Sequence, residues 1–166
     1  MYIPSDLKEW LLSVPFPLYV TGGYVRNSFL NLPDNDIDIS GPVSSSELSE
    51  YLPRTASFNI ANARLDTSVI VICGVRFEYT PFRTESYNGG EHTPKSSEFI
   101  TDPKTDSDRR DFTCNSLYYD IKNDQILDFH NGIDDIKNKI LRAVKSPDLV
   151  FSYDGLRILR MIRFAS

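Results

Sequence analysis

The sequence contains little cysteine and no long apolar run. Its two cysteines, Cys73 and Cys114, stand far apart and form no C-x-x-C pair, which argues against a zinc site. Two buried, reduced thiols are expected, and a single disulfide is the alternative. No segment approaches the roughly 20 apolar residues of a membrane helix, and the first residues lack the basic start of a signal peptide. These absences predict a cytoplasmic protein that does not enter a membrane.

Positive charge is scarce as well. The chain carries 23 acidic and 18 basic residues, for a net charge of -5. A protein that coats nucleic acid should be strongly basic, so RNA binding here would need a local basic patch. The sequence also lacks internal repeats and low-complexity tracts. Its 166 residues fit one domain that can bury a core without a disulfide or zinc.

The apolar patterns alternate between strand and helix periods. Period-two and continuous apolar runs predict strands at 18–21, 36–40, 67–72, 75–82, 117–121, 125–130 and 140–144. Helical spacing predicts helices at 5–13, 23–32, 44–52, 132–139 and from 147 onward. We expect Ser5 to cap the first helix, and Cys73 with Gly74 to form a hairpin turn. The mixture predicts an α+β fold in which helices flank a mixed β-sheet.

Three segments carry further expectations. In the helix at 23–32, the buried face should consist of Val25, Phe29 and Leu32. The polar stretch 83–108 is too long for an ordinary connection, so it is either a functional loop or disordered. Residues 146–166 have helical spacing, and no Gly, Asn or Pro ends the helix where the sequence stops, which predicts a truncated chain or one part of a split protein. Their apolar face comprises Leu156, Ile158, Leu159 and Ile162, beside a basic stripe of Arg157, Arg160 and Arg163.

Two aspartates stand in a strand pattern. Asp36 and Asp38 are separated by one residue, so on a strand they point to the same side. Neighbouring carboxylates repel and resist burial, and a divalent cation relieves both effects. Magnesium prefers such oxygen ligands, together with water and substrate phosphates. The alternative is a solvated edge strand with Ile37 and Ile39 packed inward.

A glycine pair precedes the aspartates. Gly22 and Gly23 lie between a predicted strand and a predicted helix. A glycine turn lets backbone N–H groups approach a ligand, and a helix start favours an anion. Arg26, one turn into the helix, could add a charge-assisted bond to a phosphate. The alternative is a tight turn that needs glycine for its backbone angles.

Further polar residues lie on later segments. Glu78 belongs to a strand that should neighbour the aspartate strand, where it could bind metal or deprotonate a hydroxyl; a solvent-facing acid is the alternative. The segment "RRDFTCN" groups two arginines, an acid, a hydroxyl and an amide. Arginine suits phosphate, and an Asp or Asn can hold ribose hydroxyls. Helix capping with surface arginines is the alternative.

Taken in order, "GGYVRN", "DIDI", "FEYTPFR", "RRDFTCNSL" and "DGLRILRMIRFA" resemble the N-terminal half of class II tRNA nucleotidyltransferases and bacterial poly(A) polymerases. The resemblance runs from about Leu18 to Ala165. It implies a polymerase-β-like nucleotidyltransferase head at 1–145 and the start of a helical neck at 146–166. It also implies a flexible loop from Thr84 to Glu98.

The resemblance assigns roles to individual residues. Asp36 and Asp38 would bind Mg²⁺, and Glu78 would complete the catalytic carboxylates. Asp154, with the arginines of the last motif, would begin the neck and couple it to the head. The implied nucleotide-binding residues are Gly22, Gly23, Arg26, Arg83, Arg109, Arg110, Asp111, Thr113, Asn115, Arg157 and Arg160.

The implied activity is nucleotidyl transfer from CTP and ATP to the 3′ end of tRNA, that is, CCA addition. Poly(A), CC or A addition, or a nucleotide- or RNA-binding module of a split enzyme, are the alternatives. A second polypeptide or a C-terminal body and tail would then be a partner. The family's E-D-x-x-R motif, which reads the base, should lie beyond residue 166.

One residue departs from the family pattern. The family usually reads G-G-x-V-R-D, whereas this chain has Asn27 in the last position. Asparagine keeps the size and the acceptor but loses the charge. We expect a weaker link to Arg26 and moderately lower activity, but not an inactive protein.

Overall fold

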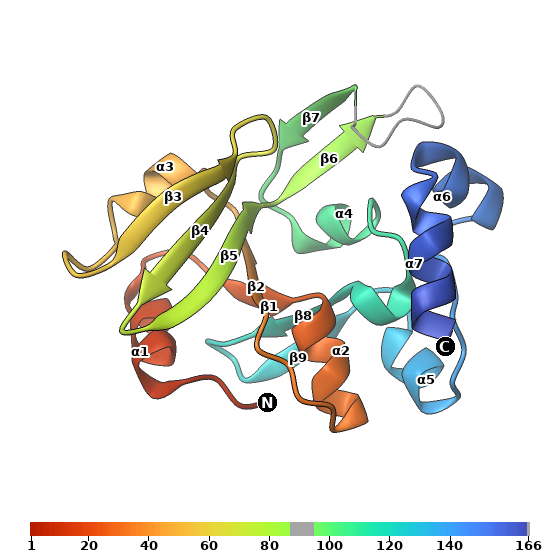
Figure 1. The fold of residues 1–166 in the computed structure, drawn as a ribbon, viewed down its shortest axis with the longest axis horizontal. Coiled ribbons are helices and arrows are strands. Elements are labelled where there is room, and N and C mark those ends of the chain that lie inside the picture. Colours follow the sequence, from red (N-terminus) through yellow and green to blue (C-terminus); the bar gives the residue numbers. More distant parts are fainter. Residues whose placement is uncertain (87–94, 166) are drawn as a thin grey trace.

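The computed structural model describes residues 1–86 and 95–165 (Figure 1). A seven-stranded mixed sheet forms its framework. In spatial order the strands are β3 (Ser57–Asn62), β4 (Thr67–Ile72), β5 (Val75–Pro81), β2 (Ile37–Gly41), β1 (Tyr19–Thr21), β8 (Leu117–Asp120) and β9 (Gln125–Asp128). β2 and β5 pair in parallel, while the other neighbours pair antiparallel. The predicted α+β fold with a mixed sheet is confirmed.

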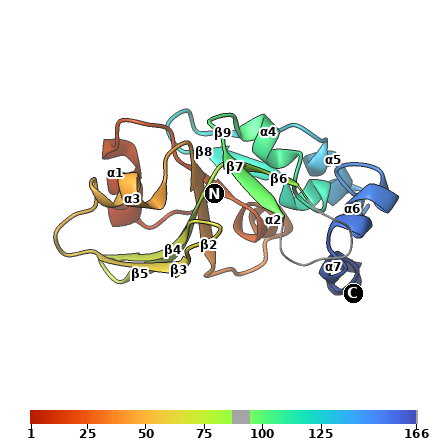
Figure 2. The ribbon, with the colours of Figure 1, turned by 90° about the horizontal axis from the view of Figure 1, so that it is seen from above.

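Helices cover the sheet and close one side of the molecule. They are α1 (Ser5–Ser13), α2 (Gly23–Leu30), α3 (Ser45–Ser49), α4 (Pro103–Ser107), the short 3-10 helix η1 (Thr113–Asn115), α5 (Gly132–Lys137), α6 (Pro147–Tyr153) and α7 (Leu156–Ala165). Figure 2 shows α1 and α3 near one end of the molecule and α6 and α7 at the other. None of the described helices combines the length and the apolar character that crossing a membrane requires.

The main core lies on one face of the strands, and a second, smaller cluster joins Tyr19, Phe82 and Tyr118. In β5 the buried positions alternate, so Phe77 and Tyr79 point inward and Glu78 between them points to the other face. Trp10 of α1 packs on Phe77 with ring centroids 5.6 Å apart. Burial of a side chain such as Phe77 contributes about 1.5–3 kcal/mol. This packing fixes which face of β5 is turned toward the site described below.

Several local expectations are confirmed. β4 and β5 are joined by Cys73 and Gly74, which both have positive φ, at 49° and 80°. Positive φ at both central residues is typical of the hairpin turns whose twist matches the strands. Both cysteines are free, as expected, but only Cys114 is buried. The turn position leaves Cys73 exposed, so the expectation of two buried thiols was half right.

Other expectations were wrong. α2 ends at Leu30 because Asn31 adopts the left-handed conformation, so Leu32 leaves the helix and is 54% exposed. Residues 140–144 form no named strand: Ala143 makes only an isolated bridge with Phe112, because η1 begins at Thr113 and ends the partner segment. α1 begins at Ser5 itself, with Pro4 in the cap position and no side-chain cap.

The long polar stretch is largely structured where it is described. It contains the strands β6 (Arg83–Ser86) and β7 (Ser96–Phe99), which form a separate two-stranded sheet, and then α4. The sequence analysis missed these elements and β3. The centre of the expected flexible loop, residues 87–94, lies outside the described residues.

The C-terminal helices adopt the expected helical conformation but with an unexpected orientation. The predicted apolar face of α7 is on the surface, with Leu159 62% and Ile162 59% exposed. Met161 and Phe164 instead pack against the core. Arg157, from the predicted basic stripe, is buried at 7% exposure. The helix therefore turns part of its basic side toward the domain.

The packing of β5 gives a first prediction. Replacement of the fully buried Phe77 by Ala should lower the free energy of unfolding by about 3–5 kcal/mol, because it leaves a cavity against Trp10. The matched Phe99→Ala change, at a position that is 56% exposed, should cost less than about 0.5 kcal/mol. Urea unfolding of both variants measures the difference. Equal losses would contradict the assignment of Phe77 to the core.

Candidate active site

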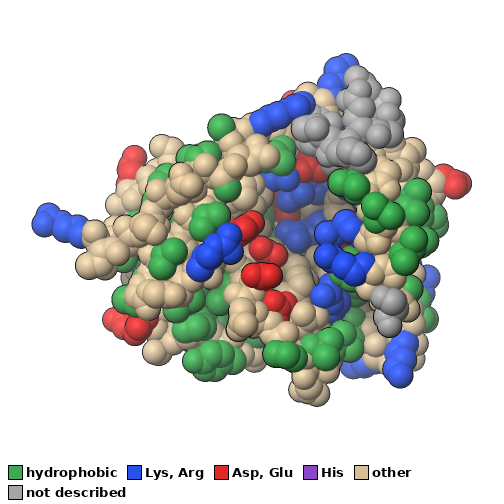
Figure 3. Space-filling model, viewed as in Figure 1, with side chains coloured by type: hydrophobic (Ala, Val, Ile, Leu, Met, Phe, Trp, Pro, Cys, Tyr) green, Lys and Arg blue, Asp and Glu red, His purple; other side chains and the backbone are tan. Residues whose placement is uncertain are grey.

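A large cavity of about 830 Å³ lies where α2, the start of β2, β6, the segment after α4 and α7 meet. Figure 3 shows acidic side chains on one side of this hollow and basic side chains on the other. Its described lining includes every predicted site residue except Glu78 and Thr113. The fold thus brings together residues that are separated by more than a hundred positions in the sequence.

The acidic side belongs to β2. Asp38 pairs in register with Thr21 of β1 and Glu78 of β5, while Ile37 and Ile39 are buried. Asp36 lies just before the strand and also lines the cavity. Burial raises the pKa of Asp38 to about 6, and the negative charges of Glu78 and Asp36 add to this effect, while Arg110 opposes it. Asp38 therefore lies where a nearby cation would stabilise its charged form.

The acidic pair suits a hard divalent cation. Its donors are carboxylate oxygens, and the repulsion between them together with the burial of Asp38 favours a bound positive charge. Within the described residues no three His, Cys, Asp or Glu side chains form a group that could hold an ion. A cation at Asp36 and Asp38 would therefore need further oxygen ligands from water or a substrate.

Glu78 lies beside Asp38 but outside the cavity lining. The parallel register of β2 and β5 sets it directly opposite Asp38, so the expected neighbourhood of the two strands is confirmed. Its side chain is 42% exposed and forms an ion pair with Arg76 at 2.9 Å. The carboxylate is thus close in the sheet but bound to a cation of its own strand.

The glycine turn approaches Asp38 closely. Gly22 has φ +70° and precedes α2. A Cβ at this position would lie 3.1 Å from Asp38 Oδ2, so both the backbone angle and the close carboxylate favour glycine. No side chain of the described residues caps the start of α2, which leaves its first N–H groups available to an anion at the cavity.

Arg26 and Asn115 meet at the cavity. One guanidinium nitrogen of Arg26 donates to Asn115 Oδ1, and the guanidinium carbon lies 4.8 Å from the ring centroid of Phe164, a cation–π contact. Asn115 is 5% exposed, and its Nδ2 donor has no partner among the described residues. An unpaired buried donor is costly, so a ligand oxygen at this point of the cavity would stabilise the arrangement.

A buried ionic network supports the basic wall. Asp106, fully buried in α4, accepts from Arg109 at 2.8 Å and from Arg110 at 3.2 Å. Tyr118 of β8 donates to the same carboxylate, and the backbone N–H of Arg83 donates to it at 3.0 Å. Burial by itself would raise the pKa of Asp106, but the two arginines lower it to about 2.

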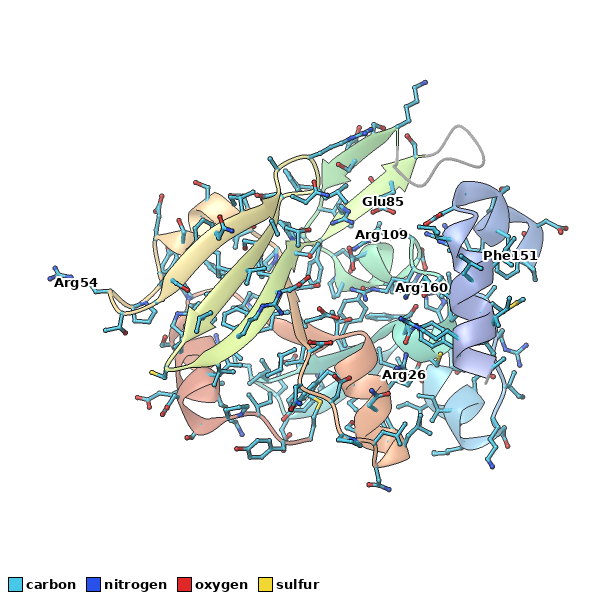
Figure 4. The ribbon with its side chains drawn as sticks, viewed as in Figure 1. Arg26, Arg54, Glu85, Arg109, Phe151 and Arg160 are labelled. Atoms are coloured by element: carbon cyan, nitrogen blue, oxygen red, sulfur yellow. The ribbon has the colours of Figure 1, made fainter. Side chains whose placement is uncertain are left out.

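Glu85 extends this network into β6. Its carboxylate accepts from Arg83 at 2.7 Å and from Arg109 at 3.1 Å, with the acid only 4% exposed. The sequence analysis missed both Glu85 and Asp106. The helical spacing of Asp106 to the two arginines, three and four residues on, was a usable signal, whereas nothing local indicated Glu85. Figure 4 shows Glu85, Arg109 and Arg160 reaching toward the same space between the elements.

Two arginines of α7 contact neighbouring elements directly. Arg157 donates to the backbone carbonyls of Arg109 at 2.8 Å and Val150 at 3.3 Å. Arg160 pairs with Asp111 at 2.6 Å. Thr113 instead donates to Asp135 at 2.8 Å and is buried away from the cavity lining. The residues of the "RRDFTCN" segment therefore divide between the cavity and internal contacts.

The fold and the cavity define the head of a class II nucleotidyltransferase. The model of the poly A polymerase head domain matches residues 18–142, so this chain belongs to that family. It is 34% identical to the CCA-adding enzyme of Ligilactobacillus salivarius over 99% of the chain and 41% of the relative. It is 36% identical to that of Enterococcus faecalis, over 99% and 41%. The chain spans about two fifths of the curated relatives it matches.

Solved structures resemble the chain over the same region. A structure of the CCA-adding enzyme of Bacillus stearothermophilus in complex with CTP aligns with a TM-score of 0.85 at 27% identity, over 99% of this chain and 40% of that one. The Thermotoga maritima CCA-adding enzyme complexed with tRNA aligns with a TM-score of 0.69 at 29% identity, over 95% and 35%. These similarities confirm the head fold that the sequence motifs imply.

The Asp106 network predicts a pH dependence. Because the pKa of Asp106 in the folded state is about 2, below the roughly 3.9 of an unfolded aspartate, the ionised carboxylate stabilises the fold at neutral pH. That stabilisation is fully present above about pH 4 and is lost as the pH falls toward 2. Asp106→Asn should lower the free energy of unfolding at pH 7 by about 3 kcal/mol and flatten its decline in acid.

The control is Asp134→Asn, because Asp134 is 74% exposed and only 3.6 Å from the exposed Lys137. This change should alter the stability by less than about 0.5 kcal/mol. Urea unfolding between pH 2 and 7 provides the measurement. An unchanged acid profile in Asp106→Asn would show that the network does not contribute as described.

Proposed function

We propose that this chain is the catalytic head of an enzyme that transfers nucleotides from CTP and ATP to the 3′ end of tRNA, the CCA-adding activity. The observation that carries the proposal is the cavity itself: Asp36 and Asp38 line one side and arginines line the other. A metal-bound triphosphate matches this distribution of charge. The names of the relatives, and the CTP and tRNA in the similar structures, support the choice of substrates.

Mg²⁺ is the proposed cofactor, held by Asp36 and Asp38. When bound, it would favour attack of the 3′-hydroxyl on the α-phosphorus and offset the charge of the leaving pyrophosphate. The raised pKa of Asp38, about 6, adds a consequence. The metal-binding form of this carboxylate should predominate only above about pH 6 in the absence of the ion.

The chain's own residues would bind and orient the triphosphate. The start of α2 at Gly22 and Gly23 offers backbone N–H groups, and Arg26 one turn later offers a guanidinium. The unpaired Nδ2 of Asn115 would donate to a sugar or phosphate oxygen. Asp106 holds Arg109 and Arg110 in place. On this proposal the protein contributes positioning and electrostatic stabilisation.

Glu78 is the proposed third carboxylate. Its position opposite Asp38 in the β2–β5 register supports this role. The carboxylate could accept the proton of the attacking hydroxyl only if its exposed pair with Arg76 opened. Exposed ion pairs contribute less than about 1 kcal/mol, so this opening costs little.

The proposal divides the chain into a head at 1–145 and the start of a neck at 146–166. The exposed apolar residues of α7, such as Leu159 and Ile162, support this division because further neck helices would cover them. The enzyme would act in the cytoplasm. The base-reading motif and most of the tRNA-binding surface would lie in the remaining part of a longer protein or in a second polypeptide.

A second candidate function is a nucleotide- or RNA-binding module of a split enzyme. The observation that favours it is that Glu78, the proposed third carboxylate, lies outside the cavity lining and pairs with Arg76. Calorimetry with CTP and ATP in the presence of Mg²⁺, beside a primer-extension assay on this chain, separates the two. Binding without extension favours the module. Extension of tRNAs with different 3′ ends, with each nucleotide alone, distinguishes CCA from CC, A and poly(A) addition.

The metal assignment gives a direct prediction. Asp38→Ala in the full-length protein should lower the rate of CTP incorporation at least about a hundredfold, because it removes a ligand that acts on the reacting phosphate. Asp6→Ala, at an exposed position of α1, is the control and should leave the rate unchanged. Radiolabelled CTP incorporation into tRNA measures both. Normal incorporation by Asp38→Ala would exclude the proposed metal site.

A further inference from the structure

The amide of Asn27 joins two charged residues at the rim of the cavity. Its Oδ1 accepts from Arg26 Nε at 3.1 Å and from Arg26 Nη2 at 2.9 Å. Its Nδ2 donates to Asp34 Oδ2 at 2.8 Å. All three residues line the cavity. The side chain that departs from the family pattern therefore still engages Arg26 through two hydrogen bonds.

The two neighbours fix the direction of this amide. The guanidinium of Arg26 can only donate, and the carboxylate of Asp34 accepts, so oxygen must face Arg26 and nitrogen must face Asp34. An aspartate at position 27 would set two carboxylates about 2.8 Å apart, at the distance the amide now spans, and like charges so close repel strongly. Asp34 thus gives a physical reason why position 27 is neutral in this chain.

Arg26 needs a nearby negative charge. Burial lowers the pKa of its guanidinium, and the positive charges of Arg163 and Arg160 add to this effect. Cys114 and Asp34 act in the opposite direction, but burial raises the pKa of the Cys114 thiol to about 11, so at pH 7 only Asp34 is charged. The other contacts of the guanidinium, with an amide oxygen and an aromatic ring, carry no formal charge. The carboxylate of Asp34 is therefore the formal charge that the Asn27 amide links to the guanidinium.

Asp34 also connects Arg26 to the metal-binding strand. Its second carboxylate oxygen, Oδ1, accepts from the backbone N–H of Asp36 at 3.0 Å. The other carboxylate oxygen of Asp34, Oδ2, lies 3.6 Å from the position that a Cβ of Gly23 would occupy. One side chain thus contacts the chain just before β2 and, through Asn27, the arginine of α2. These are the two sides between which a metal-bound triphosphate would lie.

We propose that Asp34 is a positioning residue for nucleotide binding, and that it acts on Arg26 through the amide of Asn27. Through Asn27, Asp34 holds Arg26 toward the triphosphate. Through the hydrogen bond that it accepts from the backbone N–H of Asp36, it also fixes the backbone of that residue. This inference rests on the proposed function. It predicts that the charge and the amide at positions 27 and 34 can be exchanged but that neither can be changed alone.

The test is a double-mutant cycle in the full-length protein. Asn27→Asp creates two facing carboxylates, and Asp34→Asn removes the charge. The double variant, called the exchange, again has one carboxylate and one amide at these two positions. The carboxylate at position 27 would accept from Arg26, and the amide at position 34 would donate to that carboxylate. Each single variant should raise the KM for CTP by about tenfold with a smaller change in kcat, and the exchange should recover the wild-type KM to within about threefold.

Asn35→Asp is the matched control. It adds the same carboxylate between Asp34 and Asp36, but its side chain is exposed, so KM should stay at the wild-type value. Urea unfolding of all five proteins without nucleotide gives a second readout. The two single changes should be non-additive there as well, because the contact exists in the free protein.

The outcomes separate the possible errors. Additive effects on both KM and stability would overturn the pairing of Asn27 with Asp34. Non-additive stability with an unchanged KM in every variant would overturn the positioning role and leave only a structural contact. Failure of the wild-type protein to bind or transfer nucleotide would instead refute the proposed function, whatever the four variants do. Tenfold losses in the single variants with recovery in the exchange support the proposal.

Discussion

The buried carboxylate of Asp106 is the contact on which the basic side of the cavity depends. It binds the side chains of Arg109, Arg110 and Tyr118 and the backbone of Arg83, and so it ties α4 to β6 and β8. Cationic side chains gathered around one cavity would otherwise repel one another and turn toward solvent. A buried anion behind them offsets that repulsion, and the low pKa of Asp106 reflects the strength of the contact.

The opposite side of the cavity follows the reverse rule. Asp38 is partly buried beside other acids, and its pKa is raised rather than lowered. Arg109, Arg110 and Arg160 each have a carboxylate partner, whereas Arg26 contacts amide oxygens and an aromatic ring. Asp38 lies among other acids, close to a glycine turn that admits a ligand. A cation bound to the aspartates and a polyanion bound to the arginines would balance the charges of the cavity. This charge distribution agrees with the similarity of the chain to CCA-adding enzymes. Perturbed acids in a cleft often mark functional sites.

Local patterns predicted much of this arrangement. The alternation in β5 and the turn at Cys73 and Gly74 follow from local patterns, and both are present. Asp36 lies just before β2 rather than on it, so strand periodicity orients only Asp38, although both aspartates line the cavity. The predictions of a buried Leu32 and of a strand at 140–144 were wrong. α2 ends at Leu30, before Leu32, and η1 begins at Thr113, where a partner strand would have to continue. The apolar face of α7 was found by its spacing, but spacing cannot tell whether a helix presents that face to the core or to solvent.

The sequence by itself determined which chemical groups are present and how each strand or helix orients them, because these properties depend on neighbours within a few residues. Only the tertiary structure decided that Arg157 contacts the backbone carbonyl of Arg109, that Glu85 supports Arg109, and that Glu78 lies outside the cavity lining. It also revealed that Asn27 faces Asp34. These contacts depend on how separate elements meet in space, and no periodic pattern in the chain encodes the distance between their side chains.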